Sequence, residues 1–167
     1  MKNYVPCPWS DNLANSTAIS FVLLIGILIT VIVILVLFYH RIPKEWLYGV
    51  LIPMIVLIGG SCVSCVAFAP RGVSVDEKEI ILYRYMGKVT IPRSEITDIR
   101  PYPTKETTIR LCGIGGCMGN VGLFRHSEIG NFTAYYTDPS RSYVIYRRSK
   151  RPIVITSVEP LEVEPLE

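Results

Sequence analysis

Two long runs of apolar residues dominate the pattern along the chain. The first covers residues 12–39, 28 positions without a charge, and the second covers 46–70, 25 positions. A helix needs about 20 apolar residues to cross the roughly 30 Å of hydrocarbon in a bilayer, so both runs are long enough. Only residues 40–45 separate them. The pattern predicts a transmembrane helical hairpin within 17–70, with helices over 17–39 and 46–69.

Residues 1–16 form a short, polar and turn-rich segment in which Trp9 is a candidate interfacial anchor. A cleaved signal peptide is the alternative interpretation. Against it, only Lys2 supplies a charge before the apolar run, and that run exceeds the usual 7–15 residues. It also continues into charged residues without a small-residue cleavage site. We therefore expect an uncleaved anchor.

A stripe of small residues runs along the second predicted helix and faces a notch in the first. Small side chains at spacings of three and four let helices approach closely. The stripe serves either the contact within the hairpin or self-association of two chains. Its members are Gly60, Ser64 and Ala67 in the second helix and Gly26 and Thr30 in the first.

From Arg71 onward the apolar period changes from that of a helix to alternation. Seven short β-rich runs separated by turns indicate an antiparallel barrel or sandwich over residues 71–158. Residues 92–99 are expected to be a short linking segment. The predicted fold class is therefore α+β, a helical hairpin followed by a mostly antiparallel β domain. The runs are 73–75, 80–85, 88–91, 107–112, 132–137, 143–147 and 152–156.

Part of this region resembles bacterial pleckstrin-homology-like (PH-like) domains. The similarity lies in Ile-Ile-Leu-Tyr (80–83), a turn, Val-Thr-Ile-Pro (89–92) and Ser-Glu-Ile-Thr-Asp-Ile (94–99), and then in Gly-Leu-Phe-Arg (122–125) and residues 129–135. It covers roughly residues 72–160. The resemblance implies a strongly bent seven-stranded sheet, usually closed by a C-terminal helix.

The end of the chain departs from the family's pattern. Residues 159–167 repeat Glu-Pro-Leu-Glu, which is acidic and contains two prolines. Pro165 would break a helix that began at Pro160. We therefore expect no long C-terminal helix, and an acidic disordered tail over 159–167.

Composition restricts the function classes. Hydrophobic residues make up 50% of the 167 positions, and the net charge of +3 is too small to indicate a nucleic-acid partner. Five cysteines, an odd number, exclude a complete disulfide framework. Whether Cys112 and Cys117 pair stays open. Cys62 and Cys65 have the CxxC spacing but lie in an apolar run, where we expect packing and not redox chemistry.

A glycine-rich stretch is the most distinctive feature of the β region. It matches neither a dinucleotide fingerprint nor a P-loop, because the third glycine is misplaced and no Gly-Lys-Ser/Thr closes it. Its glycines either supply positive φ in a hairpin or expose a contact surface. The candidate contact residues are Gly113, Ile114, Gly115, Gly116, Met118, Gly119, Gly122 and Phe124.

A basic cluster near the end of the domain is the second candidate. Arg147, Arg148, Lys150 and Arg151 place four cations within five residues at a predicted hairpin turn. They form either a solvated turn or a contact with anionic lipid headgroups, worth about 1 kcal/mol per cation. PH domains that bind phosphoinositides carry their cations at the first β-turn. Here that turn, residues 76–79, is acidic, so inositol-phosphate binding is not expected.

No arrangement typical of an enzyme is visible. The chain has two histidines, His40 and His126, and no nucleophile, base or metal-ligand cluster. We expect neither catalysis nor a cofactor, metal or small-molecule substrate.

The sequence thus predicts an integral membrane protein, in the inner membrane of a bacterium, that presents a β domain as a binding or assembly module. Its partners would be membrane lipids and either another protein or a second copy. The alternative is a structural subunit that acts through the hairpin, with the domain as a cap. Counting Lys2, Arg71, Lys78 and Arg84 on the terminal side against Arg41 and Lys44 in the loop favours a cytoplasmic domain. The charge density of the short loop favours the reverse orientation, and we expect the cytoplasmic one.

Overall fold

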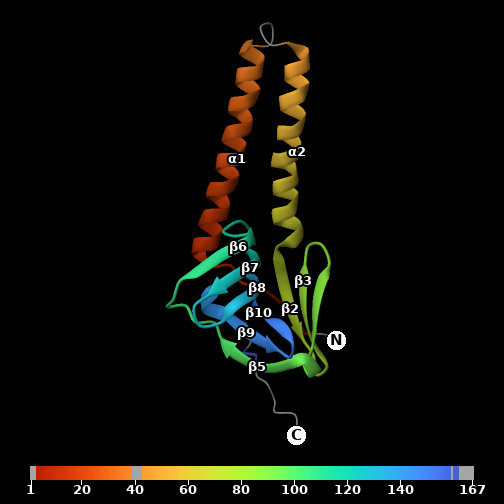
Figure 1. The fold of residues 1–167 in the computed structure, drawn as a ribbon, viewed down its shortest axis with the longest axis vertical. Coiled ribbons are helices and arrows are strands. Elements are labelled where there is room, and N and C mark those ends of the chain that lie inside the picture. The colour runs from red at the N-terminus through yellow and green to blue at the C-terminus, as the bar shows by residue number, and fades with distance from the viewer. Residues whose placement is uncertain (1–2, 39–42, 159, 162–167) are drawn as a thin grey trace.

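A computed structural model describes residues 3–38, 43–158 and 160–161. Two long helices, α1 (Asp11–Phe38) and α2 (Lys44–Phe68), project side by side from one end of a β domain. The two ends of the chain lie with the domain (Figure 1). The expected helical hairpin followed by a β domain is therefore confirmed.

Helix α1 begins earlier than the apolar pattern predicts, because polar side chains form its first turns. Ser10 caps it, with its Oγ accepting a hydrogen bond from the amide of Leu13 over 3.2 Å. Helix α2 runs through Pro53 and ends before Pro70, which cannot continue a helix. The loop expected at residues 40–45 lies partly outside the described residues, which resume at Pro43.

The N-terminal segment contains a strand that the sequence pattern did not predict. Strand β1 (Asn3–Pro6) pairs antiparallel with β2 (Pro70–Val75), from Asn3 opposite Val75 to Pro6 opposite Gly72. The helical hairpin is thus inserted between two neighbouring strands of one sheet. Strand β1 has only four residues, and two prolines, Pro6 and Pro8, lie at and just after its end. The sequence pattern therefore indicated turns and not a strand.

Two sheets build the domain. The first has the order β1-β2-β3-β4, where β3 is Glu79–Arg84 and β4 is Lys88–Pro92. The second has the order β5-β9-β10-β8-β7-β6, and all its pairs are antiparallel except β10 with β8. Its strands are β5 Ile96–Pro101, β6 Thr108–Ile114, β7 Asn120–His126, β8 Gly130–Tyr136, β9 Ser142–Arg147 and β10 Lys150–Thr156.

The main core lies between the two sheets. Val73, Ile80, Leu82 and Ile91 of the first sheet form one buried cluster with isoleucines of β9 and β10. A second, aromatic cluster around Phe132 involves the alternate residues of the second sheet, which point to its other face. Strand β10 is therefore buried on both faces, which explains its continuous Ile-Val-Ile run. The architecture is a sandwich and not a closed barrel.

The prediction of a linking segment over residues 92–99 is wrong, because strand β5 begins at Ile96. Ile96 and Ile99 are three positions apart and would point to opposite faces of a regular strand. A β-bulge between Ile96 and Asp98 restores the register, and both isoleucines pack against the main core. Strand β7 was also missed, since its glycine breaks the apolar alternation. The described domain therefore has more strands than the seven expected.

No helix follows β10 in the described residues, as predicted. Most of the acidic tail, at Glu159 and 162–167, lies outside the described residues. Within it, Leu161 is buried in the core between the sheets. That part of the tail is therefore packed against the domain.

Candidate functional site: the junction of helices and domain

The tip of the glycine-rich hairpin, between β6 and β7, is bound to the first turns of α1. Ser16 Oγ donates to the carbonyl oxygen of Gly116 over 2.7 Å, and the amide of Met118 donates to Thr17 Oγ1 over 2.9 Å. Thr17 is 6% exposed. The tip is therefore a docking element within the chain, and Phe124, expected in a contact surface, belongs to the aromatic core.

Backbone geometry explains the glycines of this hairpin. Gly113 has φ +123° and Gly122 has φ +134°, values that favour glycine. The two lie opposite each other, and a Cβ on Gly122 would stand 2.8 Å from the Cα of Gly113. The strands can approach this closely only without side chains. The expected positive-φ role is confirmed at both positions.

Cys117, at the tip of this hairpin, contacts the CxxC segment of α2. Cys65 and Cys62 both lie near its thiol. Burial, followed by these two neighbours, raises the pKa of Cys117 to about 11, so the thiol is neutral at pH 7. All the cysteines of the chain are free, and Cys112 is exposed on β6. In the structure Cys117 thus lies against α2, and Cys112 and Cys117 are not bonded to each other.

The β3–β4 turn is tied to the end of α2. The amide of Met86 donates to the carbonyl oxygen of Ala67 over 2.8 Å. Tyr85 and Met86 at this turn are exposed, with 55% and 67% of their surface accessible. Arg71 places its guanidinium 5.7 Å from the centre of the Tyr85 ring. Exposed apolar side chains and cations therefore meet where α2 joins the domain.

A groove of about 940 Å³ opens beside the start of α1. Its walls come from the N-terminal segment, the tip of the glycine-rich hairpin and the loop before β9. Trp9 is 42% exposed, and Asp138 is engaged by Ser140 and Arg141. The other polar side chains that line it include Asp11, Asn12, Thr104 and Asn120.

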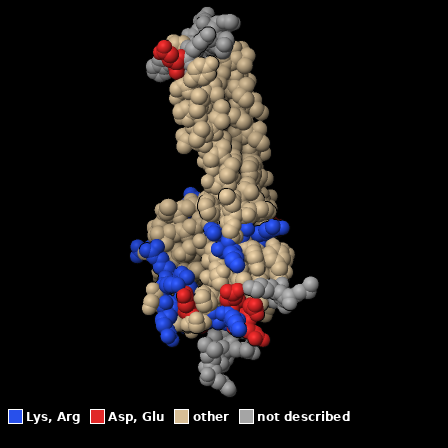
Figure 2. Space-filling view, turned by 90° about the vertical axis from the view of Figure 1, so that its right-hand side faces the viewer, with Lys and Arg blue, Asp and Glu red and all other residues tan. Residues whose placement is uncertain are grey.

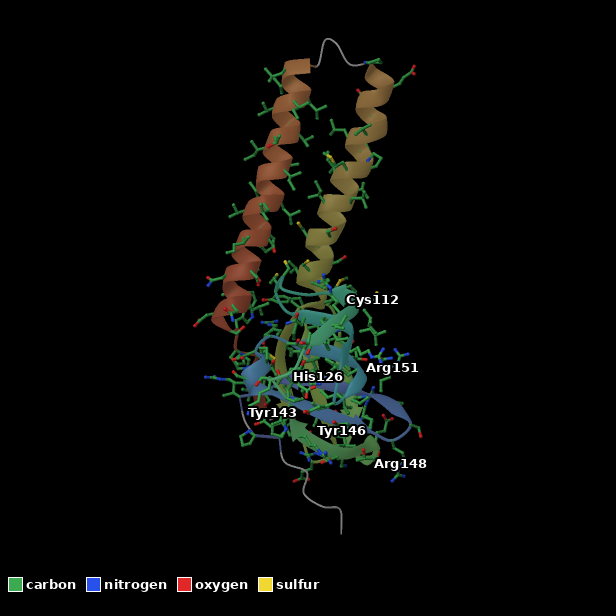
Figure 3. The ribbon with its side chains drawn as sticks, turned by 60° about the vertical axis from the view of Figure 1, so that its left-hand side comes forward. Cys112, His126, Tyr143, Tyr146, Arg148 and Arg151 are labelled. Carbon is green, nitrogen blue, oxygen red and sulfur yellow. The ribbon has the colours of Figure 1, made fainter. Side chains whose placement is uncertain are left out.

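The predicted basic cluster lies elsewhere. Figure 3 shows Arg148 at the end of the domain remote from the helices, on the β9–β10 hairpin. Lys150 forms an ion pair with Glu95 at 2.8 Å, and the Arg147 guanidinium donates to the carbonyl oxygen of Arg151 over 2.9 Å. The cluster therefore does not face the side from which the helices leave, and two of its four cations are engaged within the domain.

The small-residue stripe has no partner in the described structure. Nothing lies within 4 Å of a Cβ built on Gly26 or Gly60, and the hydroxyls of Thr30 and Ser64 bond to carbonyls of their own helices. Ala67 is buried, but at the junction with the domain. The close contact within the hairpin, one of the two expected uses of the stripe, is not observed among the described residues.

His126 serves the core. It is 1% exposed, its Nδ1 accepts from the amide of Glu128 over 3.2 Å, and its ring meets Tyr102 edge to face. Among the residues that the structure describes, no three His, Cys, Asp or Glu side chains are placed to hold a metal ion.

Comparison with known proteins identifies the β domain. The model of the bacterial PH domain family matches residues 71–165, more than half of the chain. The chain belongs to the bacterial PH domain family. No curated protein and no solved structure matched the chain.

The resemblance to PH-like domains seen in the sequence is thus confirmed. The match to the PH domain starts at Arg71, so it excludes both helices and β1. In this chain β1 nevertheless adds an edge strand to the first sheet of the PH domain. The junction therefore joins family and non-family parts through backbone hydrogen bonds.

Sequence reasoning missed the part that Arg84 plays in this PH domain. Its guanidinium lies 5.5 Å from the centre of the Phe68 ring and 5.7 Å from that of Tyr135. Phe68 and Arg84 belong to different elements, and Tyr135 lies far along the chain. A charge directly after the apolar run 80–83 was the available signal, but its partners are set by the tertiary structure.

Proposed function

We propose that this chain is an integral membrane protein that holds its PH domain in a defined orientation at the membrane surface, as a binding module. Both helices are long and apolar enough to cross a bilayer. In their most apolar stretches, 0% of α1 and 6% of α2 is buried. Figure 2 shows a column of uncharged side chains from the domain up to the loop. An exposed apolar surface of this size needs lipid or another protein to cover it.

The pairing of β1 with β2 is the observation that carries this proposal. Because β1 precedes α1 and β2 follows α2, both ends of the hairpin are held in one sheet. Cleavage after α1, as for a signal peptide, would remove β1 from the PH domain. The N-terminal helix is therefore better explained as a permanent anchor, and the domain as fixed relative to it.

The surface offered to a soluble partner is the end remote from the helices. Arg148 is exposed there and Arg151 is exposed nearer the middle of the domain, and no carboxylate of the described residues forms an ion pair with either (Figure 3). Exposed cations favour a partner with an acidic surface and speed its association. We propose binding and not catalysis, which the core position of His126 supports.

Cross-linking in membranes tests the module. A photoreactive amino acid replaces Arg148 in one variant and Thr90, exposed on β4, in the matched control. We expect a protein adduct at position 148 that is absent at position 90 and is lost when Arg147, Lys150 and Arg151 are changed to Ser. Adducts of equal yield at both positions would show that this end binds no specific partner.

Assembly through the helices is the second candidate function. The open faces at Gly26 and Gly60 favour it, since two chains could approach closely there. Gly26→Leu with Gly60→Leu should then reduce the oligomer in mild detergent, compared with Val36→Leu. An unchanged oligomer size would exclude assembly through these helix faces and leave partner binding by the PH domain as the proposed function.

We further propose the bacterial inner membrane as the site and the cytoplasm as the side of the PH domain. The positive charges that follow α2 support this orientation. A phosphatase or fluorescent reporter fused after Glu167 reports the side directly. Alkaline phosphatase activity there would reverse the orientation without affecting the rest of the proposal.

A further inference from the structure

Arg84 has hydrogen-bond donors that the described protein does not satisfy. Its Nε is buried, and no acceptor lies within hydrogen-bond distance. No carbonyl, hydroxyl or carboxylate oxygen among the described residues accepts from the rest of its guanidinium. A buried donor without an acceptor destabilises the folded state, and more so when it is charged. The Nη groups, which are not buried, are the donors of Arg84 that an acceptor from outside the chain can reach.

The surroundings of Arg84 hold its guanidinium in place and leave its edge for a ligand. Phe68, the last residue of α2, and Tyr135 of β8 lie within 5.5 and 5.7 Å of it. Cation–π contacts of this kind restrict the plane of the group without using its N–H donors. The β3–β4 turn passes nearby, with the Cβ position of Gly87 3.4 Å from Nη2 of Arg84. The donor set is therefore ordered in advance of binding.

The position along the chain defines where the ligand comes from. Phe68 is the last residue of the apolar helix α2, and Pro70 follows two residues later. Arg84 lies opposite Pro70 in the neighbouring strand. The neighbouring Tyr85 and Met86 are exposed, as side chains in the headgroup region of a bilayer often are. Figure 2 shows Lys and Arg side chains on the domain directly below the helices. In a membrane this level is occupied by lipid phosphates.

We propose that the junction of α2 with the β3–β4 hairpin binds the phosphate group of an anionic phospholipid, held by Arg84 and assisted by Arg71. Guanidinium groups match the oxygens of a phosphate in a bidentate manner. Arg71 stacks on Tyr85 and has no ion-pair partner among the described residues, so its charge adds to the attraction. This inference rests on the membrane insertion proposed above. The site lies away from the β9–β10 hairpin, where the sequence placed lipid contact.

The test uses the full-length protein in a detergent without phosphate groups, titrated with phosphatidylglycerol and followed by native mass spectrometry. Diacylglycerol is the control without a phosphate, and glycerol 3-phosphate is the soluble source of the same group. The variants are Arg84→Gln and Arg71→Gln. Arg125→Gln is the matched control, because Arg125 is exposed on β7.

We expect saturable binding of phosphatidylglycerol and none of diacylglycerol. Arg84→Gln should weaken binding about tenfold, the effect of losing one charge-assisted hydrogen bond. Arg71→Gln should weaken it less, and Arg125→Gln should bind like the wild type. A cooperative thermal transition in lipid-free detergent confirms that each variant is folded. If Arg84→Gln does not fold, the comparison of Arg71→Gln with Arg125→Gln decides.

Equal affinities of the Arg84, Arg71 and Arg125 variants would overturn the site. Equal binding of glycerol 3-phosphate and phosphatidylglycerol would overturn the lipid as the source of the phosphate. Neither result depends on a protein partner, so the module can fail its cross-linking test independently of this site.

Discussion

The backbone amide of Cys7 donates a hydrogen bond to the carbonyl oxygen of Arg71 over 3.1 Å, although the entire helical hairpin lies between them in the sequence. This bond extends the β1–β2 ladder toward the helices. Nearby, the Thr137 hydroxyl donates to the carbonyl oxygen of Pro8 over 2.5 Å. The chain before α1 is thus held to both sheets and is part of the fold of the domain.

A first prediction follows for a protein without the hairpin. Residues 1–10 joined to residues 70–167 by a short Gly/Ser linker should fold into a soluble monomer, because β1 then still covers β2. The matched comparison is residues 70–167 alone, in which β2 becomes an open edge that favours aggregation. Size-exclusion chromatography and thermal denaturation followed by circular dichroism measure both. Identical melting temperatures and elution volumes would show that β1 contributes nothing.

A second prediction concerns the glycine-rich hairpin. Gly122→Ala should destabilise the protein by about 2–3 kcal/mol, since the new Cβ adds a clash with the opposite strand to the strain of a positive φ. The control is Gly130→Ala, with φ +75° and nothing within 4 Å of the new atom, which should cost about 1 kcal/mol. Denaturant unfolding provides the two free energies. A Gly122 variant no less stable than the Gly130 variant would contradict the close approach of the strands.

A third prediction tests the docking of the hairpin tip on α1. Thr17→Val removes the acceptor of the Met118 amide and leaves that donor unpaired, at a cost of about 1–3 kcal/mol. Hydrogen exchange at Met118 should therefore become about tenfold faster or more. Thr30→Val is the control, because the Thr30 hydroxyl bonds only to its own helix. Unchanged exchange in the Thr17 variant would mean that other contacts hold the tip.

A fourth prediction concerns pH and the buried thiol next to β1. Burial raises the pKa of Cys7 from 9.0 to about 12, so the folded state favours the neutral thiol. A pKa that is higher in the folded state means that the contribution is complete below pH 9 and is lost as pH rises toward 12. The difference in stability between wild type and Cys7→Ala should therefore shrink over this range. Melting temperatures at pH 8 to 11 measure it, and a constant difference would argue against burial as the cause.

Reagent access gives an independent check on the same thiol. An alkylating reagent at pH 8 should modify the exposed Cys112 well before the buried Cys7, because reaction requires access and the thiolate. Mass spectrometry of peptides after short exposure distinguishes the two. In a chain lacking residues 1–6, Cys7 is expected to react faster.

The sequence alone determined the two helices and the class of the domain. Runs such as 21–38 are apolar on every side, and no other element than a helix satisfies its backbone within the run itself. Alternation and turn chemistry after Arg71 likewise indicated strands, and the order of residues in 80–99 indicated the PH-like family. These signals are local, since each depends only on residues close together in the chain.

Only the tertiary structure decided the partners of these elements. Three relationships join residues far apart in sequence. They are the pairing of β1 with β2, the hydrogen bond of Met118 to Thr17, and the position of Arg84 between Phe68 and Tyr135. The same holds for the β-bulge in β5, where Ile96 and Ile99 share a core that their spacing alone would deny them. Burial and hydrogen bonding across the chain set these relationships, because a short segment carries no information about which distant surface will cover it.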